Sequence, residues 1–244
     1  MLDVQIDDGG NRDLVMLYGT PVPAESLSPI DDWLSDDFRI ITPETVSIGV
    51  TPDEALPGLK QALQEHDVSE PVLLGHSLGA YRAFQLALDD DFDVHSLVLI
   101  GPLAVMPDER LEQYNEMAEQ LSAGELDLAE VAIELWFRPE YVESNPEVGD
   151  QVRRWFQQMG DDALIDCLHH ELTGPDLHSK LDQIDVPACV IVGDQDVGTP
   201  PEWAERIHEL LPDSEMHLIR DCAHFPHYEK PAPTRRILES FLSS

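Results

Sequence analysis

The fold of this chain is decided by the stretch PVLLGHSLGAY, residues 71–81. Its apolar start has the character of a buried strand, and a helical pattern begins at Leu78. Between the two lies Gly75-His-Ser-Leu-Gly79, which matches the pattern G-x-S-x-G in the strand–turn–helix context that this pattern requires. Glycine at both ends permits a turn in which any Cβ would clash, and the turn holds the serine hydroxyl clear of the sheet. The stretch predicts that Ser77 is a nucleophile; a glycine-rich turn with an incidental serine is the alternative.

A serine hydroxyl of ordinary acidity needs a base, and the base needs an acid that orients it. In sheets with this serine turn, the acid and then the histidine follow the serine along the chain. Asp194 and Asp196 follow one predicted strand, and His224 and His227 follow the next. Both pairs therefore lie at carboxyl ends of strands, where α/β sheets build their sites.

Short apolar runs alternate with helical patterns along the whole chain. The runs are mostly continuous rather than alternating, which is typical of strands buried on both faces of a parallel sheet. The predicted strands are residues 14–18, 38–41, 71–74, 96–100, 188–192 and 216–219, and the predicted helices include 58–66, 78–88, 202–211 and 234–242. This alternation predicts an α/β fold with a mostly parallel central sheet and helices on both faces.

One interval interrupts the alternation. Residues 103–178 contain no strand pattern, and their apolar spacing predicts four helices separated by glycine and proline. We therefore expect a core formed by residues 1–102 and 179–244, with a helical cap (103–178) inserted between two strands.

The composition limits the partners that this protein can bind. The chain has 244 residues, and its 49 acidic residues against 14 basic ones give a formal net charge of -35. Such a surface repels nucleic acid and anionic membranes, which are bound through basic patches. Three cysteines without close spacing, no apolar run that could span a membrane and no secretory signal pattern lead us to expect a cytoplasmic protein with reduced thiols.

We predict that stability or activity rises with salt. The chain contains only three lysines beside its acidic excess, a balance that suits a high-salt habitat, and a Debye length of about 3 Å at 1 M salt screens self-repulsion. Thermal unfolding from 0.1 to 3 M NaCl measures the effect. A melting temperature that stays flat or falls would indicate an ordinary soluble acidic enzyme instead.

Three motifs together resemble the α/β-hydrolase fold family, over essentially the whole chain. They are GHSLG at 75–79, Gly193-x-x-Asp196 followed by TPPE at 199–202, and AHFPHYEKP at 223–231. In relatives the catalytic histidine is followed by Glu and Pro five and seven residues later, as His224 is here. The resemblance implies a catalytic triad of Ser77, Asp196 and His224. Asp194 is then a turn-capping carboxylate and His227 a surface or packing histidine.

The resemblance also implies an oxyanion hole made by the backbone N–H groups of Thr20 and Leu78. Relatives usually carry His-Gly where this chain has Tyr18-Gly19, a difference that affects the pocket wall and not the backbone donors. The candidate pocket residues are Tyr18, His76, Trp136, Arg138 and Trp155. Because only Val4–Ile6 precede the first predicted strand, we expect the usual leading hairpin to be shortened.

Within the family, the chain is similar to small serine esterases and 3-oxoadipate enol-lactonases. Ser77 excludes haloalkane dehalogenases and epoxide hydrolases, which use an aspartate nucleophile, whereas cofactor-free haloperoxidase-like relatives stay open. The expected function is hydrolysis of a carboxylic ester or lactone through an acyl-enzyme, without cofactor or metal, by a monomer or homodimer. His169-His170-Glu171 lacks the spacing of a metal-ligand set. The alternative is a ligand-binding or signalling protein on the same fold, with slow or no turnover.

The expected substrate is compact. Aromatic residues of the cap lead us to expect that short-chain esters or lactones react better than esters of about ten carbons. Arg138, Arg153 and Arg154 lie among these aromatic residues. Each either pairs with a surface carboxylate or turns inward to bind an anionic substrate.

Overall fold

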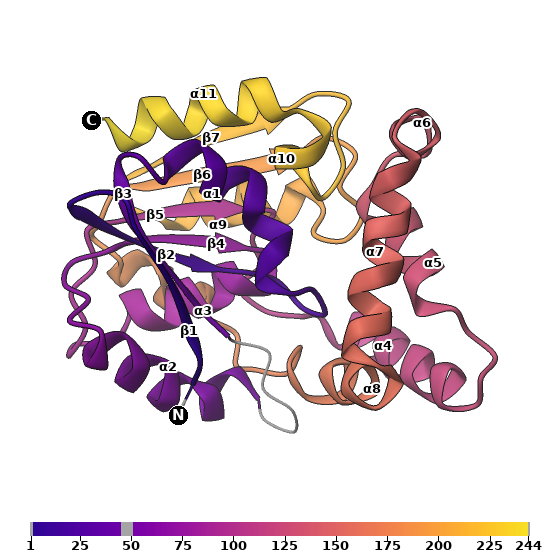
Figure 1. The fold of residues 1–244 in the computed structure, drawn as a ribbon. Helices are drawn as coiled ribbons and strands as arrows, with labels where there is room; N and C mark the ends of the chain where they lie inside the picture. The colour runs from indigo at the N-terminus through magenta and orange to yellow at the C-terminus, as the bar shows by residue number, and fades with distance from the viewer. Residues whose placement is uncertain (1, 45–50, 244) are drawn as a thin grey trace.

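A computed structural model describes residues 2–44 and 51–243. Within these residues, seven strands form one sheet in the order β1-β3-β2-β4-β5-β6-β7 (Figure 1). All neighbouring strands are parallel except β1 and β3. The strands are β1 (Val4–Asp8), β2 (Arg12–Leu17), β3 (Phe38–Pro43), β4 (Val72–His76), β5 (Ser96–Ile100), β6 (Ala188–Gly193) and β7 (Ser214–Ile219). The predicted mostly parallel α/β sheet is confirmed.

Continuous apolar runs form these strands because both faces of the sheet are covered. In β2, Leu14 and Met16 join one buried cluster, whereas Val15 and Leu17 join a second cluster on the other face. Helices α1 (Ser28–Leu34) and α11 (Pro231–Leu242) contribute to the first cluster. Helices α2 (Pro52–Glu65), α3 (Leu78–Ala87) and α9 (Pro201–Leu210) contribute to the second (Figure 1).

Strand β1 is the one strand of the described sheet that the sequence did not predict. It pairs antiparallel with β3, with Val4 opposite Pro43, and does not form a hairpin pair with β2. Four of its five residues are exposed, and its sequence VQIDD lacks the apolar run of a buried strand. An edge strand of this kind is stabilised by pairing with its neighbour, so composition alone gives little signal.

Helix α2 begins earlier than the predicted helix at 58–66. Thr51 accepts a hydrogen bond from the Glu54 amide, and the Glu54 carboxylate accepts one from the Thr51 amide. This capping box, with Pro52 in the first turn, starts the helix six residues before its amphipathic part.

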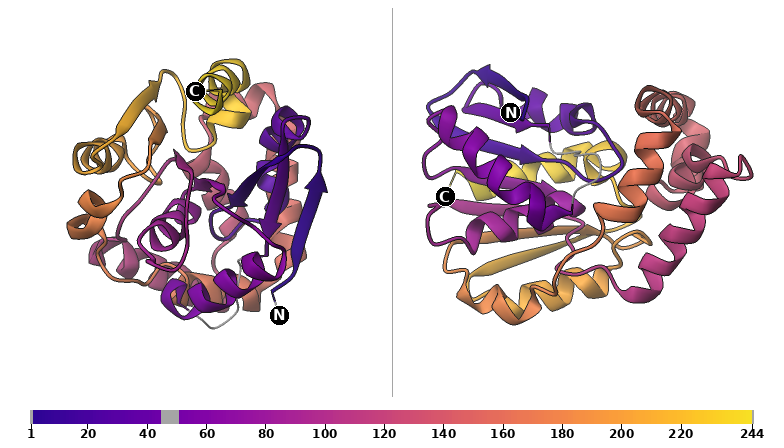
Figure 2. Two further views of the ribbon diagram at one scale, coloured as in Figure 1. Left: turned by 90° about the vertical axis from the view of Figure 1, so that its left-hand side faces the viewer. Right: turned by 90° about the horizontal axis from the view of Figure 1, so that it is seen from below.

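The segment between β5 and β6 is a helical insertion, formed by α4 (Asp108–Ser122), α5 (Leu128–Trp136), α6 (Pro139–Ser144), α7 (Pro146–Met159) and α8 (Asp161–His170). Figures 1 and 2 show that these helices lie together at one end of the sheet. The sequence predicted four of them and missed the short α6. Pro139 and Pro146 begin α6 and α7, and Gly160 lies between α7 and α8 with a φ of 79°.

The remaining described elements are short: 3₁₀ helices at Ala24–Leu27 and His178–Gln183, and α10 (Pro226–Glu229). In the ranges that the structure describes, no helix has the length and apolar character needed to cross a bilayer. The three cysteines, Cys167, Cys189 and Cys222, are free and buried, which agrees with the expected absence of a disulfide framework.

Candidate active site

Ser77 lies in the sharp turn between β4 and α3. Its φ of 55° and ψ of -122° place it in the left-handed half of conformational space, which residues with a Cβ rarely adopt. Its amide donates a 2.9 Å hydrogen bond to the carbonyl oxygen of Ile100 on β5. A Cβ added to Gly75 would lie 2.5 Å from the Ala80 Cα atom, and one added to Gly79 would lie 1.8 Å from the Leu17 oxygen. Both glycines are therefore required by close backbone approach, as the sequence predicted.

The loop after β2 packs directly against this turn. A Cβ added to Gly19 would lie 2.9 Å from the Ser77 Cβ atom and 3.4 Å from Ser77 Oγ. Thr20 follows Gly19, so its backbone is held beside the serine. Leu78 is the first residue of α3, where an amide has no partner within the helix. Two backbone segments that carry the predicted oxyanion donors thus meet at Ser77.

Asp196 and His224 form a buried hydrogen-bonded pair. The two side chains follow β6 and β7, and His224 Nδ1 lies 2.7 Å from Asp196 Oδ2. Thr199 also holds the carboxylate: its amide donates to Oδ1 at 2.9 Å and its hydroxyl to Oδ2 at 3.0 Å. Because a carboxylate only accepts, Nδ1 of His224 donates this hydrogen bond, and in a neutral imidazole Nε2 is then the acceptor.

The imidazole of His224 lies next to the backbone that supports Ser77. A Cβ added to Gly101 would lie 3.1 Å from His224 Cε1, and Gly101 directly follows Ile100, the partner of the Ser77 amide. The hydrogen bonds of the described residues do not include one between Ser77 Oγ and His224. In proteins without substrate such a bond is often long and tightens when the substrate binds.

Asp194 and His227, the alternatives to Asp196 and His224, make hydrogen bonds elsewhere. Asp194 Oδ1 accepts a 3.3 Å hydrogen bond from the Cys222 amide, which joins the two loops after β6 and β7. His227 is buried, and its Nε2 donates to the Ser26 carbonyl oxygen at 3.0 Å. Burial lowers the pKa of His227 to about 3, so its ring stays neutral. The hydrogen-bonded pair is therefore formed by Asp196 and His224. Asp194 and His227, the alternatives from the same two loops, have other partners.

His76 is buried beside His224. Its Nε2 donates to the His224 carbonyl oxygen at 3.0 Å, and its ring centroid lies 4.7 Å from that of His224. Burial, followed by the nearby His224 and His227, holds the pKa of His76 well below its usual range. A neutral His76 therefore supports the loop that carries His224.

Comparison with known proteins identifies the family of this chain. The sequence profile of the alpha/beta hydrolase family matches residues 18–237. The chain belongs to the alpha/beta hydrolase family. Its relatives of low identity include several hydrolases. One is the 2-hydroxy-6-oxononadienedioate/2-hydroxy-6-oxononatrienedioate hydrolase 2 of Pseudomonas putida, 25% identical over 70% of this chain and 62% of that protein.

One further relative and one solved structure match almost the whole chain. The pimeloyl-[acyl-carrier protein] methyl ester esterase of Nitrosomonas europaea is 26% identical over 95% of this chain and 96% of that protein. The crystal structure of the enol-lactonase from Burkholderia xenovorans LB400 superposes with a TM-score of 0.88, at 19% identity, over 100% of this chain and 96% of the other. This last likeness concerns the fold.

In this alpha/beta hydrolase the helical insertion is attached to the loop that carries His224. The His224 amide donates to the Trp136 carbonyl oxygen at 3.1 Å. Buried Glu229 accepts from Arg138 Nε at 2.7 Å, from the Arg138 amide at 3.2 Å and from the Ala223 amide at 3.3 Å. The glutamate of the AHFPHYEKP motif thus fixes the end of α5 against the histidine loop.

A small cavity lies between the Thr20 loop and the insertion. Its volume is about 40 Å³, and Thr20 and Trp136 are among its lining residues. The other lining residues are Pro21, Tyr114, Met117, Leu128, Val131, Ala132, Leu135, Phe156, Leu168 and Leu172. At roughly 15 Å³ for each water molecule, this space holds a few waters and no ligand of ordinary size.

Four of the predicted pocket residues do not line this cavity. Tyr18 is fully buried and donates to Glu44, and His76 supports the histidine loop. Arg138 is ion-paired with Glu229, and Trp155 is buried against Tyr228. Aromatic spacing on a helix did not separate residues that pack inside the insertion from residues that face the cavity.

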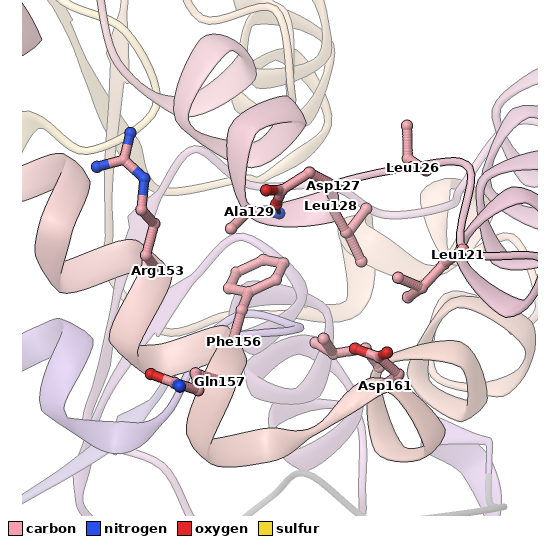
Figure 3. Close-up of a pocket in the computed structure, with 11 residues that line it drawn as sticks. Leu121, Leu126, Asp127, Leu128, Ala129, Arg153, Phe156, Gln157 and Asp161 are labelled. Carbon is pink, nitrogen blue, oxygen red and sulfur yellow. Dashed lines mark hydrogen bonds between the residues drawn. The ribbon is translucent and has the colours of Figure 1, made fainter.

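A larger hollow of about 460 Å³ lies within the insertion itself (Figure 3). None of Ser77, Asp196 and His224 lines it. Phe156 and Leu128 line both this hollow and the small cavity. At its rim, Arg153 pairs with Glu130 at 2.6 Å and with Asp150 at 3.0 Å.

One group of side chains has the composition of a metal site. Ligand atoms of Cys189, Glu215 and His217 lie within 4.8 Å of one another on β6 and β7. His217 Nε2 is already paired with Glu215 Oε1 at 2.9 Å. Burial, with Glu215 nearby, raises the pKa of the Cys189 thiol, and a thiol that keeps its proton is a poor ligand. The trio therefore fits a histidine–glutamate contact beside a core cysteine.

Proposed function

We propose that this protein is a serine hydrolase that cleaves a carboxylic ester or lactone. The observation that carries the proposal is the 2.7 Å contact between His224 Nδ1 and Asp196 Oδ2 beside the strained turn of Ser77. Membership of the alpha/beta hydrolase family and the esterase among its relatives support the same chemistry.

In the proposed reaction, Ser77 Oγ attacks the substrate carbonyl carbon while His224 Nε2 removes its proton. Asp196 orients the imidazole and stabilises the imidazolium that forms. The amides of Thr20 and Leu78 donate to the developing oxyanion, and one such donor is worth about 10²–10³-fold in kcat. His224 then protonates the leaving alkoxide, and a water molecule activated by the same histidine hydrolyses the acyl-enzyme.

The helical insertion acts in this proposal as a lid that forms part of the pocket wall. Trp136 and Phe156 line the small cavity beside Thr20, so they are the aromatic residues that would contact a bound acyl group. Arg138 and Arg153 pair with carboxylates of the protein. These pairs favour the alternative in which the arginines serve the fold, and the proposal includes no anionic substrate group.

A fluorophosphonate ester is expected to label Ser77 covalently. The turn presents this hydroxyl beside a histidine that can accept its proton, which is the condition for attack on phosphorus. Peptide mass spectrometry locates the adduct. Label on another residue, or a folded protein that takes up none, would contradict the hydrolase proposal. Labelling of Ser77 without turnover of any ester, lactone or thioester would favour a ligand-binding role.

Short-chain esters and lactones are expected to exceed esters of about ten carbons in kcat/KM. The cavity of about 40 Å³ has to widen for any substrate, and a compact acyl group requires the smaller displacement of the insertion. A panel of p-nitrophenyl esters and small lactones, measured at low and high salt, provides the comparison. A clear preference for the long-chain esters would show that the pocket opens further than this structure suggests.

A further inference from the structure

A cluster of polar side chains is buried next to the proposed oxyanion hole. Thr20 Oγ1 donates to Glu171 Oε2 at 2.5 Å, and Arg82 Nη2 donates to the same oxygen at 2.8 Å. The side chains of Arg82 and Glu171 are only 3% and 1% exposed. Arg82 Nη1 also lies 3.4 Å from the Tyr18 carbonyl oxygen, in the loop that leads to Thr20.

The three residues come from three parts of the fold. Thr20 lies in the loop after β2, and Arg82 lies on α3, five residues after Ser77. Glu171 directly follows α8, the last helix of the insertion. One carboxylate therefore joins the end of the insertion to both segments that carry the proposed oxyanion donors.

The opposite charges of Arg82 and Glu171 allow a carboxylate to lie next to the proposed oxyanion hole. An unpaired carboxylate beside the oxyanion would repel the negative charge that develops in the transition state. The guanidinium of Arg82 balances the charge of Glu171 and leaves the carboxylate able to accept from the Thr20 hydroxyl. The hydroxyl and the amide belong to one residue, so fixing the side chain also restricts how the amide can turn.

We infer that Glu171 is a positioning residue for the oxyanion hole. It holds Thr20 in the orientation that directs the Thr20 amide at the substrate oxygen, and it does so only while the end of the insertion is docked on the core. The inference rests on the proposed function. It adds that docking of the insertion completes the catalytic arrangement as well as covering the pocket.

Thr20→Val tests the inference with little change in shape, because it removes the hydroxyl and keeps the backbone amide. We expect kcat to fall about 10–100-fold, less than the loss of a whole donor, with KM within about threefold of the wild type. Thr20→Ser keeps the hydroxyl and is the matched control, expected to retain most of kcat. The rate at which a fluorophosphonate labels Ser77 should follow kcat, because its phosphoryl oxygen occupies the oxyanion hole.

A double variant separates positioning from stability. Arg82→Met or Glu171→Leu alone leaves a buried charge without its partner and should destabilise the fold. Arg82→Met with Glu171→Leu removes both charges, and such replacements are often neutral or stabilising. We expect the melting temperature of the double variant to stay near the wild type while kcat stays as low as in Thr20→Val. Adding Thr20→Val to it should cause no further loss.

Two results would overturn the inference while leaving the proposed function intact. One is a wild-type kcat in Thr20→Val, and the other is a wild-type kcat in the stable double variant. Both results count only if the wild-type protein hydrolyses esters and Ser77 of each variant is labelled. A wild type that neither labels nor hydrolyses would overturn the proposed function itself, and this inference with it.

Discussion

Ser77→Ala is expected to lower kcat for ester hydrolysis by about 10⁶-fold, the order of the loss found when the serine of a triad is removed. The side chain that forms the acyl-enzyme is lost, whereas the Asp196–His224 pair and the backbone donors remain. The φ of 55° is equally unfavourable for serine and alanine, since both carry a Cβ, so stability should change little. Steady-state kinetics and thermal unfolding measure the two effects.

Ser77→Gly is the matched control for the turn. Glycine adopts this backbone conformation without strain, and relief of strain at such a residue is worth about 1–3 kcal/mol. The glycine variant should therefore be as inactive as the alanine variant but should unfold at a higher temperature. Residual activity near the wild-type level in either variant would show that another group is the nucleophile.

His224→Ala is expected to remove nearly all activity, leaving roughly 10³–10⁴-fold catalysis over water from binding and the oxyanion hole. The variant lacks the base that accepts the Ser77 proton, and Asp196 is left without the imidazole that it orients. Ester hydrolysis by single turnover and at steady state measures the loss.

His227→Ala is the control for the second histidine of the same loop. Because His227 Nε2 donates to Ser26 in the interior, its removal leaves a buried acceptor unpaired and should cost about 1–3 kcal/mol of stability. At a temperature where this variant is folded, kcat should stay within a few-fold of the wild type. The opposite pattern, with activity lost in His227→Ala and kept in His224→Ala, would show that His227, and not His224, is the base.

Several features of this protein follow from rules that act over a few residues. The G-x-S-x-G turn, the two glycines that backbone contact requires and the proline that begins α7 are all readable from the chain. Residues buried on both faces of the sheet produce the continuous apolar runs, so six of the seven strands in the described residues were found. Strand β1 was missed because an exposed edge strand lacks that run and depends on β3 for its hydrogen bonds.

The roles of single side chains depended on more distant contacts. Spacing alone left Asp194 and Asp196 as equal candidates for the acid that orients the histidine. Only the resemblance to a family favoured Asp196. In the structure it is Asp196 whose carboxylate contacts His224, 28 residues away, and Thr199 donates to the same carboxylate. Thr199 is the first residue of the TPPE motif at 199–202, but nothing in the sequence predicted its contact with the carboxylate.

By itself, the sequence determined the α/β sheet, the serine turn, the order of acid and histidine and the acidic surface. Each of these depends on local backbone geometry, periodic burial or composition. Tertiary structure alone decided which aromatic residues face the cavity, that Arg138 belongs to Glu229, and that Glu171 meets Thr20 and Arg82 across 151 and 89 residues. A buried polar group is satisfied by whichever partner the packed elements bring to it, and no local pattern in the chain records that partner.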